Sequence, residues 1–269
     1  MEIDESCRIP LAIIFFTIII AIFGAHLHLS KPLISLLAVS NFRTSWLSRE
    51  TVFTIFFFLE TGTLFVLMWF TPGYIRVKNV LGWLAIASGL ATLFCMAQIY
   101  LLPTQILWNS GNTIAYYFST TLLLGMTSLP AMLQLDLNYS EVQGKHRTKM
   151  DVEIVRKAVV WLSIAAALVS VLVISQGIHQ VITLKKINHQ STQISLELLT
   201  GLYQPLLVMR FGLLIVGVSW LLMSVRRIMK KDRDVKDLIG LVYMGFLLVL
   251  IGEILGRFLF FATHVRIGV

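Results

Sequence analysis

The chain has 269 residues, of which 57% are hydrophobic and 13% are charged, and its formal net charge is +8. This composition excludes an ordinary soluble globular domain and is typical of an integral membrane protein. The two cysteines, Cys7 and Cys95, are too few for a disulfide framework or a thiolate-held iron–sulfur cluster. Any redox centre that needs thiolates is therefore expected on another chain.

Apolar residues occur in blocks long enough to cross a hydrocarbon core about 30 Å thick, which takes roughly 20 helical residues. Strands of a membrane barrel are shorter and alternate in polarity, so helices are expected here. In chain order the blocks predict an all-α polytopic membrane protein, with a single membrane domain over residues 1–269 and a bundle of seven transmembrane helices. These spans are predicted at about 10–29, 51–71, 80–102, 113–135, 157–181, 205–225 and 238–263.

The first predicted span follows a short polar segment, Met1 to Cys7, which contains three acidic residues. A cleaved signal peptide has a basic leader instead. We therefore expect the helix at 10–29 to remain as a permanent span.

The distribution of Lys and Arg between the loops predicts the orientation, because cytoplasmic loops carry the excess. Of the 22 basic residues, two lie within predicted spans, fourteen fall on one side and six on the other. The amino terminus is therefore expected inside and the carboxyl terminus outside. The basic run "RRIMKKDRDVK" is then an inner loop beside the lipid bilayer, and we do not expect it to bind nucleic acid.

The loop "NFRTSWLSRE", Asn41 to Glu50, lies on the outer side between the first two spans. His28 closes the first helix there, and Glu50 opens the second, where the helix dipole favours a carboxylate. Imidazole titrates near neutrality, so this pair can accept protons from a bound hydroquinone. Polar and aromatic groups beside the pair complete a predicted quinol site, whose members are His28, Asn41, Arg43, Ser45, Trp46 and Glu50. The alternative is that the hydroxyl groups tether the loop, with Ser48 as N-cap of the second helix.

Other ionisable groups in or beside the spans lie in the same outer half. Glu253 and Arg257 are four residues apart on the seventh helix, and we interpret them as a structural ion pair within the membrane. Glu60 is interpreted as a protonated carboxyl group hydrogen-bonded inside the bundle. Secondary candidates for the site are Arg210, His179 and His264. No metal ligands are predicted in this chain.

Three stretches of the sequence carry a family resemblance: "LHLSKP" at 27–32, "NFRTSWLSRE" at 41–50 and "GEILGRFLFFATH" at 252–264. With the supporting segments "CMAQIYLLPTQILWNS", "SQGIH" and "MRFGLL", they run in order along nearly the whole chain. The chain thus resembles the membrane anchor subunit of the bacterial anaerobic dimethyl sulfoxide reductase family.

The resemblance implies a non-catalytic anchor in the bacterial cytoplasmic (inner) membrane that binds menaquinol near the outer face and oxidises it. Electrons would pass to an iron–sulfur subunit and then to a molybdopterin catalytic subunit that reduces dimethyl sulfoxide or a related oxide in anaerobic respiration. The iron–sulfur clusters and the molybdopterin are held by those partner subunits on the outer face. In the family pattern the quinol-site residues correspond to His28 and Glu50.

The family usually has eight helices and an outside amino terminus, whereas seven spans place the amino terminus of this chain inside. Absence of the family's first helix, through the choice of start codon or a shortened protein, would give this arrangement. The segment "MEIDESCR" would then be the inner loop that precedes the family's second helix.

Two other classes of function remain as alternatives. A haem b-containing quinol-oxidising subunit needs two histidines at matching depth on different helices, but His28, His179 and His264 lie at the outer edge. A seven-helix receptor is expected to have an outside amino terminus, and a transporter to have an inverted repeat with broken helices, which the sequence does not show. The quinol-oxidising anchor is therefore favoured.

Overall fold

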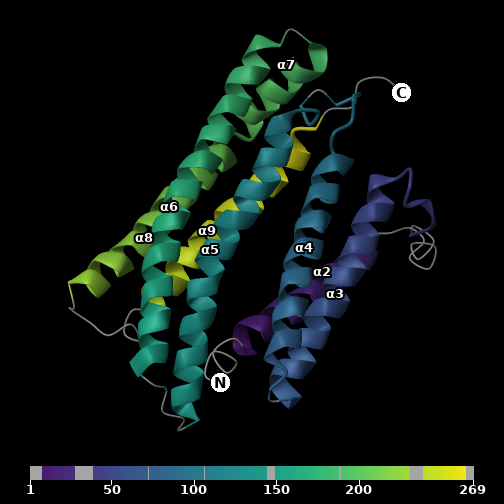
Figure 1. Ribbon diagram of the computed structural model, residues 1–269. Coiled ribbons are helices and arrows are strands. Elements are labelled where there is room, and N and C mark those ends of the chain that lie inside the picture. Colours follow the sequence, from purple (N-terminus) through teal and green to yellow (C-terminus); the bar gives the residue numbers. More distant parts are fainter. Residues whose placement is uncertain are drawn as a thin grey trace. The chain divides into compact units, whose positions relative to one another are not determined.

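A computed structural model describes residues 8–27, 39–71, 73–105, 107–143, 149–187, 189–230 and 239–264 of the chain. Within these ranges the regular structure is entirely helical, and seven helices are long and apolar enough to cross a membrane (Figure 1). The prediction of an all-α polytopic membrane protein is confirmed. The chain packs into two compact units, Met1–Tyr100 and Leu101–Val269.

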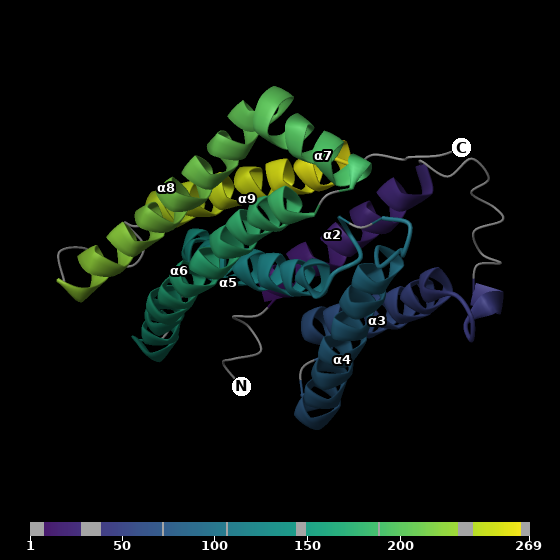
Figure 2. The ribbon, with the colours of Figure 1, turned by 90° about the horizontal axis from the view of Figure 1, so that it is seen from above.

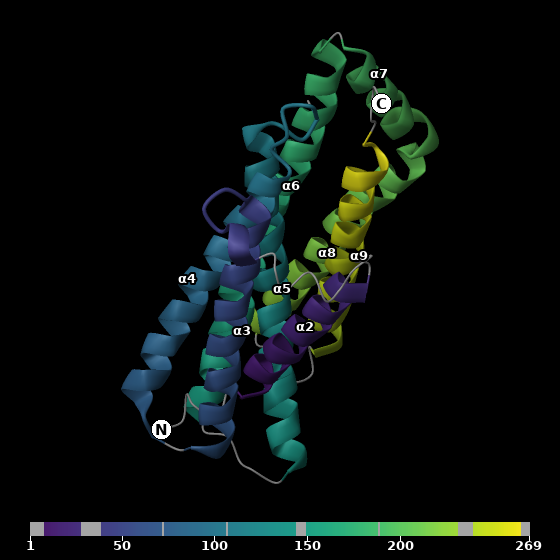
Figure 3. The same cartoon turned by 90° about the vertical axis from the view of Figure 1, so that its right-hand side faces the viewer.

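The first unit contains α2 (Arg8–Leu27), α3 (Trp46–Phe70) and α4 (Ile75–Ile99). Helices α3 and α4 form an antiparallel pair, side by side in Figures 1 and 3. The tight turn between them uses left-handed backbone at Gly73, with φ of 96°, and at Tyr74, with φ of 53°. Glycine adopts this conformation without steric cost, which explains its place in the turn.

Aromatic stacking fastens α2 to α3 within the first unit. The ring of Phe15 stacks on Phe58 and on Phe65, with centroids 5.5 Å and 5.2 Å apart. A Cβ at Gly62 would lie 3.0 Å from the Phe15 ring, so this glycine lets the ring approach the α3 backbone. Small residues that admit close packing are typical of helix contacts in membranes.

The second unit is a bundle of four long helices with a short helical connection at one end (Figures 1 and 2). Its elements are α5 (Gly111–Val142), α6 (Lys149–Lys186), α7 (Gln190–Glu197), the π-helical turn η2 (Leu198–Leu202), α8 (Gln204–Met229) and α9 (Ile239–Ala262). The sequence did not predict α7, because its segment "QSTQISLE" is too short and too polar to form a span. Its start is capped by His189, whose Nδ1 accepts the backbone N–H of Ser191 at 3.3 Å.

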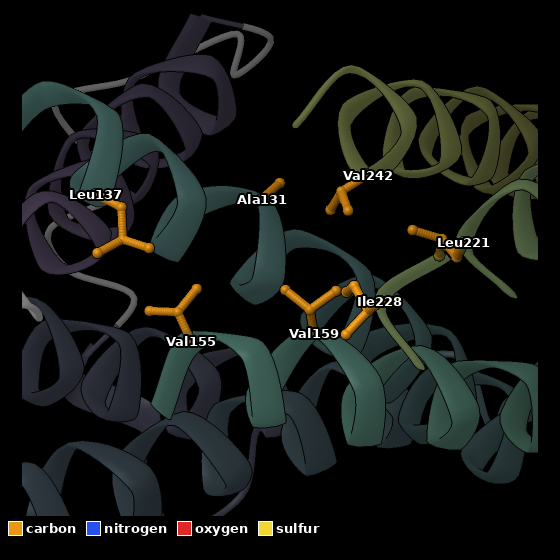
Figure 4. Close-up of a cluster of buried hydrophobic side chains, with 7 residues drawn as sticks. All are labelled: Ala131, Leu137, Val155, Val159, Leu221, Ile228 and Val242. Carbon is orange, nitrogen blue, oxygen red and sulfur yellow. The ribbon is translucent and has the colours of Figure 1, made fainter. Parts of the chain in front are cut away.

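Buried aliphatic side chains from all four long helices fill the core of the second unit. Figure 4 shows one such cluster, which comprises Ala131, Leu137, Val155, Val159, Leu221, Ile228 and Val242. Helices α8 and α9 approach most closely at two glycines, where a Cβ at Gly217 would lie 3.0 Å from the carbonyl oxygen of Gly245. Backbone contact of this kind holds helices together through dispersion forces, because lipid offers no hydrophobic drive.

Most helices extend further than the predicted spans. Helix α3 begins at Trp46, ahead of the predicted start at 51, because the polar residues Ser48, Arg49 and Glu50 interrupt the apolar pattern of its first turns. Helices α5 and α6 have 32 and 38 residues, so at 1.5 Å per residue they measure about 48 Å and 57 Å. Pro130 lies inside α5, where it is buried in the bundle.

Candidate functional site

In the first unit, the segment that precedes α3 forms a compact loop closed by hydrogen bonds. The Asn41 carbonyl oxygen accepts the backbone N–H groups of Thr44 at 3.1 Å and Ser45 at 3.0 Å. Ser45 is the N-cap of α3, and its hydroxyl accepts the backbone N–H of Ser48 at 3.4 Å. The sequence instead indicates Ser48 as the cap, but Ser48 lies inside the helix that begins at Trp46 and is only 3% exposed.

Arg49 holds this loop against the start of α3. Its Nε donates a hydrogen bond to the Phe42 carbonyl at 3.0 Å, and its Nη2 donates to the Arg43 carbonyl at 2.7 Å. The guanidinium also lies 4.2 Å from the centroid of the Trp46 ring, within range of a cation–π interaction. Arg49 thus binds two backbone carbonyl groups of the loop and the aromatic side chain at the start of the helix.

Glu50 follows this arginine in the early turns of α3 and is half-buried. Beside it, the Trp46 ring meets Phe94 of α4 edge to face, with centroids 5.9 Å apart, yet remains 37% exposed. Phe42 is also exposed, so a carboxylate capable of accepting a proton lies next to open aromatic surface.

The structure brings the predicted residues Asn41, Arg43, Ser45, Trp46 and Glu50 into one loop and the first turns of one helix. The side chains of Asn41 and Arg43 are exposed, and both residues shape the loop through their carbonyl oxygens. His28 lies outside the described residues. Its pairing with Glu50 therefore stays a prediction.

In the second unit, charged and aromatic side chains gather where α5 and α8 begin and α9 approaches its end. We call this group the two-arginine cluster; it comprises Tyr116, Tyr117, Arg210, Glu253 and Arg257. Arg210 is 4% exposed and Glu253 is 2% exposed, with Nη2 and Oε1 separated by 3.8 Å. Arg210 Nη2 also donates a hydrogen bond to the hydroxyl of Tyr116 at 3.0 Å.

Arg257 differs from its predicted role. The ion pair that the structure gives Glu253 is with Arg210 on the neighbouring helix, and not with Arg257 four residues along α9. The Arg257 guanidinium lies 3.9 Å from the centroid of the Tyr117 ring, and its Nη2 donates to Thr120 Oγ1 at 3.2 Å. Arg257 therefore contacts α5 through a stacked ring and a hydrogen bond, while the carboxylate on its own helix is paired with Arg210.

The other two candidates of the second unit are His179 and His264. His179 is exposed on α6. His264 follows α9, and its ring lies over Trp108, with centroids 4.2 Å apart. The Trp108 indole N–H donates to the Phe260 carbonyl at 3.2 Å, so this stack closes one end of the helix. Within the described ranges, no group of three or more His, Cys, Asp or Glu side chains converges as for a metal ion.

Sequence reasoning missed several residues that the structure shows to be important. Arg49 was not among the predicted site residues, although it organises the loop. Tyr116 and Tyr117 carry no charge, so a search for ionisable groups passed over them, yet they surround both arginines of the cluster. An adjacent pair of tyrosines inside a predicted span was the available signal, because a buried phenol needs a partner.

Comparison with known proteins identifies the family. The model of the DMSO reductase anchor subunit (DmsC) family matches residues 6–263. The protein is 28% identical over 250 residues to YnfH, an anaerobic dimethyl sulfoxide reductase subunit of Escherichia coli, a match that covers 90% of this protein and 76% of the relative. It is 24% identical over 244 residues to the C subunit of the anaerobic dimethyl sulfoxide reductase of Haemophilus influenzae, again with 90% and 76% covered. No solved structure gives a significant match.

The family match spans most of the chain, and the relatives agree with it along the same length. The seven apolar helices supply the membrane embedding that such a subunit needs. The chain therefore belongs to the DMSO reductase anchor subunit family and is a multi-pass membrane anchor of a DMSO reductase-type complex.

Proposed function

We propose that this anchor binds menaquinol at the loop before α3 and oxidises it for the reductase complex. The observation that carries the proposal is the half-buried carboxylate of Glu50, which stands in the first turns of α3 beside a loop held rigid by Arg49. The exposed faces of Phe42 and Trp46 offer a stacking surface for the ring of a quinol. A fixed base next to apolar surface suits a lipid-soluble donor with a polar head.

Oxidation of a hydroquinone releases two electrons and two protons, so the site needs a proton acceptor and an electron acceptor. Glu50 accepts a proton in this proposal, and His28 is the second base and the partner of Glu50. The electrons pass to an iron–sulfur subunit, and from it to a molybdopterin catalytic subunit, because this chain supplies no thiolate set for a cluster. The anchor itself contributes binding and proton uptake.

We place this site at the outer face of the bacterial inner membrane, with the amino terminus inside and the carboxyl terminus outside. The excess of Lys and Arg in the alternate loops supports that orientation. A reporter enzyme fused after Val269, active only outside the cytoplasm, tests it, and a cytoplasmic carboxyl terminus would contradict the placement.

The central experiment compares two electron donors in membranes that contain the whole complex. Glu50→Gln, and separately His28→Ala, is expected to lower menaquinol-dependent reduction of an S-oxide by about 100-fold, the usual contribution of a general base. Reduction by a dye that donates directly to the partner subunits should stay unchanged. Equal loss of activity with both donors would count against the quinol role, because the two residues would then be needed for assembly of the complex and not for menaquinol oxidation in particular.

Glu153→Gln is a matched control for the loss of a carboxylate. Glu153 lies on α6 with its side chain 47% exposed, so the substitution changes charge without touching the loop before α3. Both donors should support wild-type rates in this variant. Quenching of a fluorescent quinol analogue by the membranes then separates weakened binding from slowed proton transfer in Glu50→Gln.

A further inference from the structure

A small cavity lies inside the second unit, next to the two-arginine cluster. Its volume is about 20 Å³, and its wall includes Tyr116, Gln180, Arg210, Gly256 and Thr263. A cavity needs a volume of roughly 10–15 Å³ to hold one water molecule. The cavity is therefore large enough for a water molecule or one small monatomic ion.

The cavity wall includes a buried hydrogen-bond donor that lacks an acceptor within the described part of the chain. Arg210 Nε is buried and has no hydrogen-bond partner there, and its side chain is 5% exposed. The Tyr116 hydroxyl accepts the bond from Arg210 Nη2, so its own proton is available for another acceptor. The Thr263 hydroxyl already donates to the Leu259 carbonyl at 2.8 Å and adds no donor. A wall that offers N–H and O–H groups suits an electron-rich occupant.

The charges of the cluster do not balance. Arg210 and Arg257 carry two positive charges, whereas Glu253 carries one negative charge, which leaves an excess of one positive charge within the cluster. Among the described residues the Glu253 oxygens make no hydrogen bond, and Oε1 lies 3.8 Å from Arg210, so this carboxylate neutralises its partner only loosely. Arg257 Nη1 is likewise buried without a hydrogen-bond partner in those ranges. Uncompensated charge inside a membrane protein is costly, and an anion would offset it.

Gly256 lets both donors approach the backbone of α9. A Cβ at this position would lie 2.6 Å from Arg210 Nε and 2.6 Å from the Tyr116 hydroxyl oxygen, closer than real contacts allow. The absence of a side chain on α9 therefore allows the two donor atoms to lie close together in the wall of the cavity. We propose that this cavity binds a small inorganic anion of the size of chloride, held by Arg210 Nε and the Tyr116 hydroxyl.

Thermal unfolding of the purified chain in detergent tests the proposal, with chloride replacing gluconate at constant ionic strength. Binding to the folded state raises its stability as the free ligand exceeds Kd. The unfolding midpoint of the wild type is expected to rise by about 3 °C for each tenfold increase in chloride beyond Kd. A midpoint that does not respond to chloride would overturn the proposal and indicate that the cavity holds only water.

Two variants locate the effect. Gly256→Ala displaces both donor atoms without changing any charge, because its Cβ would lie 2.6 Å from each, and Tyr116→Phe removes one donor while keeping the ring. Both are expected to abolish or strongly weaken the chloride response, by at least about tenfold in Kd for the lost donor. If Gly256→Ala does not fold, Tyr116→Phe decides the question alone. An unchanged chloride response in Tyr116→Phe would overturn the proposal.

Two glycines nearby provide matched controls. A Cβ at Gly212 on α8 would meet no described atom within 4 Å, whereas a Cβ at Gly252 on α9 would lie 3.1 Å from the Leu214 side chain. Gly212→Ala should keep both the midpoint and the chloride response. Gly252→Ala should lower the midpoint but keep the response, which separates loss of packing from loss of the anion. Loss of the response in Gly212→Ala would contradict the assignment to this cavity.

Discussion

Arg210 of α8 and Glu253 of α9 form a buried ion pair, with 3.8 Å between Nη2 and Oε1, in the interior of a four-helix bundle. The two residues come from helices that lie side by side, so the pair ties α8 to α9 at the end where η2 leads into α8 (Figure 2). Around it, Tyr116 accepts a hydrogen bond from the arginine. The buried Glu253 carboxylate is thus paired with an arginine of the neighbouring helix, and not with Arg257 of its own helix.

The first prediction concerns the loss of this pair. Glu253→Gln leaves Arg210 as an uncompensated buried charge and is expected to destabilise the protein by about 3 kcal/mol. Unfolding midpoints of the purified chain in detergent provide the measurement. Glu153→Gln breaks the exposed pair with Arg156 and should cost less than about 1 kcal/mol. Equal effects of the two substitutions would contradict the buried ion pair.

The second prediction concerns the stacking of Arg257 on Tyr117. Arg257→Lys loses the planar group and its bond to Thr120, and Tyr117→Leu loses the ring; each is expected to lower stability by about 1 kcal/mol or more. Because the two groups act together, the double variant should cost less than the sum of the single variants. Additive losses in a double-mutant cycle would show that the stack contributes nothing.

The third prediction concerns the close approach of α8 and α9. A Cβ at Gly245 would lie 2.6 Å from Leu221 Cγ and 3.0 Å from the Gly217 carbonyl oxygen. Gly245→Ala is therefore expected to push the helices apart and cost about 1–3 kcal/mol. Gly240→Ala on the same helix meets no described atom within 4 Å and serves as the control. A stabilising effect of Gly245→Ala would mean that the helices tolerate a wider spacing.

The fourth prediction concerns the loop before α3. Arg49→Lys cannot donate to both the Phe42 and Arg43 carbonyls in the same geometry, so the loop should open more often. Hydrogen exchange at the Thr44 and Ser45 amides is expected to quicken by about tenfold, the equivalent of one lost hydrogen bond. Arg43→Lys, which changes an exposed side chain and keeps the carbonyl, should leave exchange unaltered.

The fifth prediction concerns Glu60 on α3. The Ser88 hydroxyl of α4 lies 2.5 Å from Glu60 Oε2 and 3.2 Å from the Ala85 carbonyl oxygen. The Ser88 hydroxyl donates to Glu60 Oε2, so this bond joins α4 to α3. Glu60→Gln, which keeps an acceptor oxygen for Ser88, should then change stability by less than about 1 kcal/mol, whereas Ser88→Ala, which removes the donor, should cost more. A larger loss in Glu60→Gln than in Ser88→Ala would contradict this hydrogen bond as the main role of Glu60.

The membrane fold could be predicted from the sequence because each span is a continuous run of apolar residues. Seven runs of apolar residues correspond to the seven long helices found among the described residues, because a backbone in lipid must satisfy its own hydrogen bonds. The predicted ends of the helices were less accurate, as at Trp46, because helical turns with polar residues extend beyond the hydrocarbon core of the membrane. The short helix α7 was not predicted for the same reason, because its sequence contains no continuous run of apolar residues.

The candidate site shows the same division. The gathering of Asn41, Ser45, Trp46 and Glu50 was predictable, because they are close along the chain and one loop brings them together. The role of Arg49 was not, since which carbonyl groups a guanidinium reaches depends on how the loop folds back.

The amino-acid sequence by itself determined the membrane class, the number of spans and the charged residues that the membrane must accommodate, because hydropathy and charge are properties of single residues. Only the tertiary structure decided that Glu253 pairs with Arg210 while Arg257 stacks on Tyr117. Two residues four positions apart on one helix share a face, as Glu253 and Arg257 do. Which side chain pairs with the Glu253 carboxylate nevertheless depends on the distances between helices, and these are set by packing, as at Gly256.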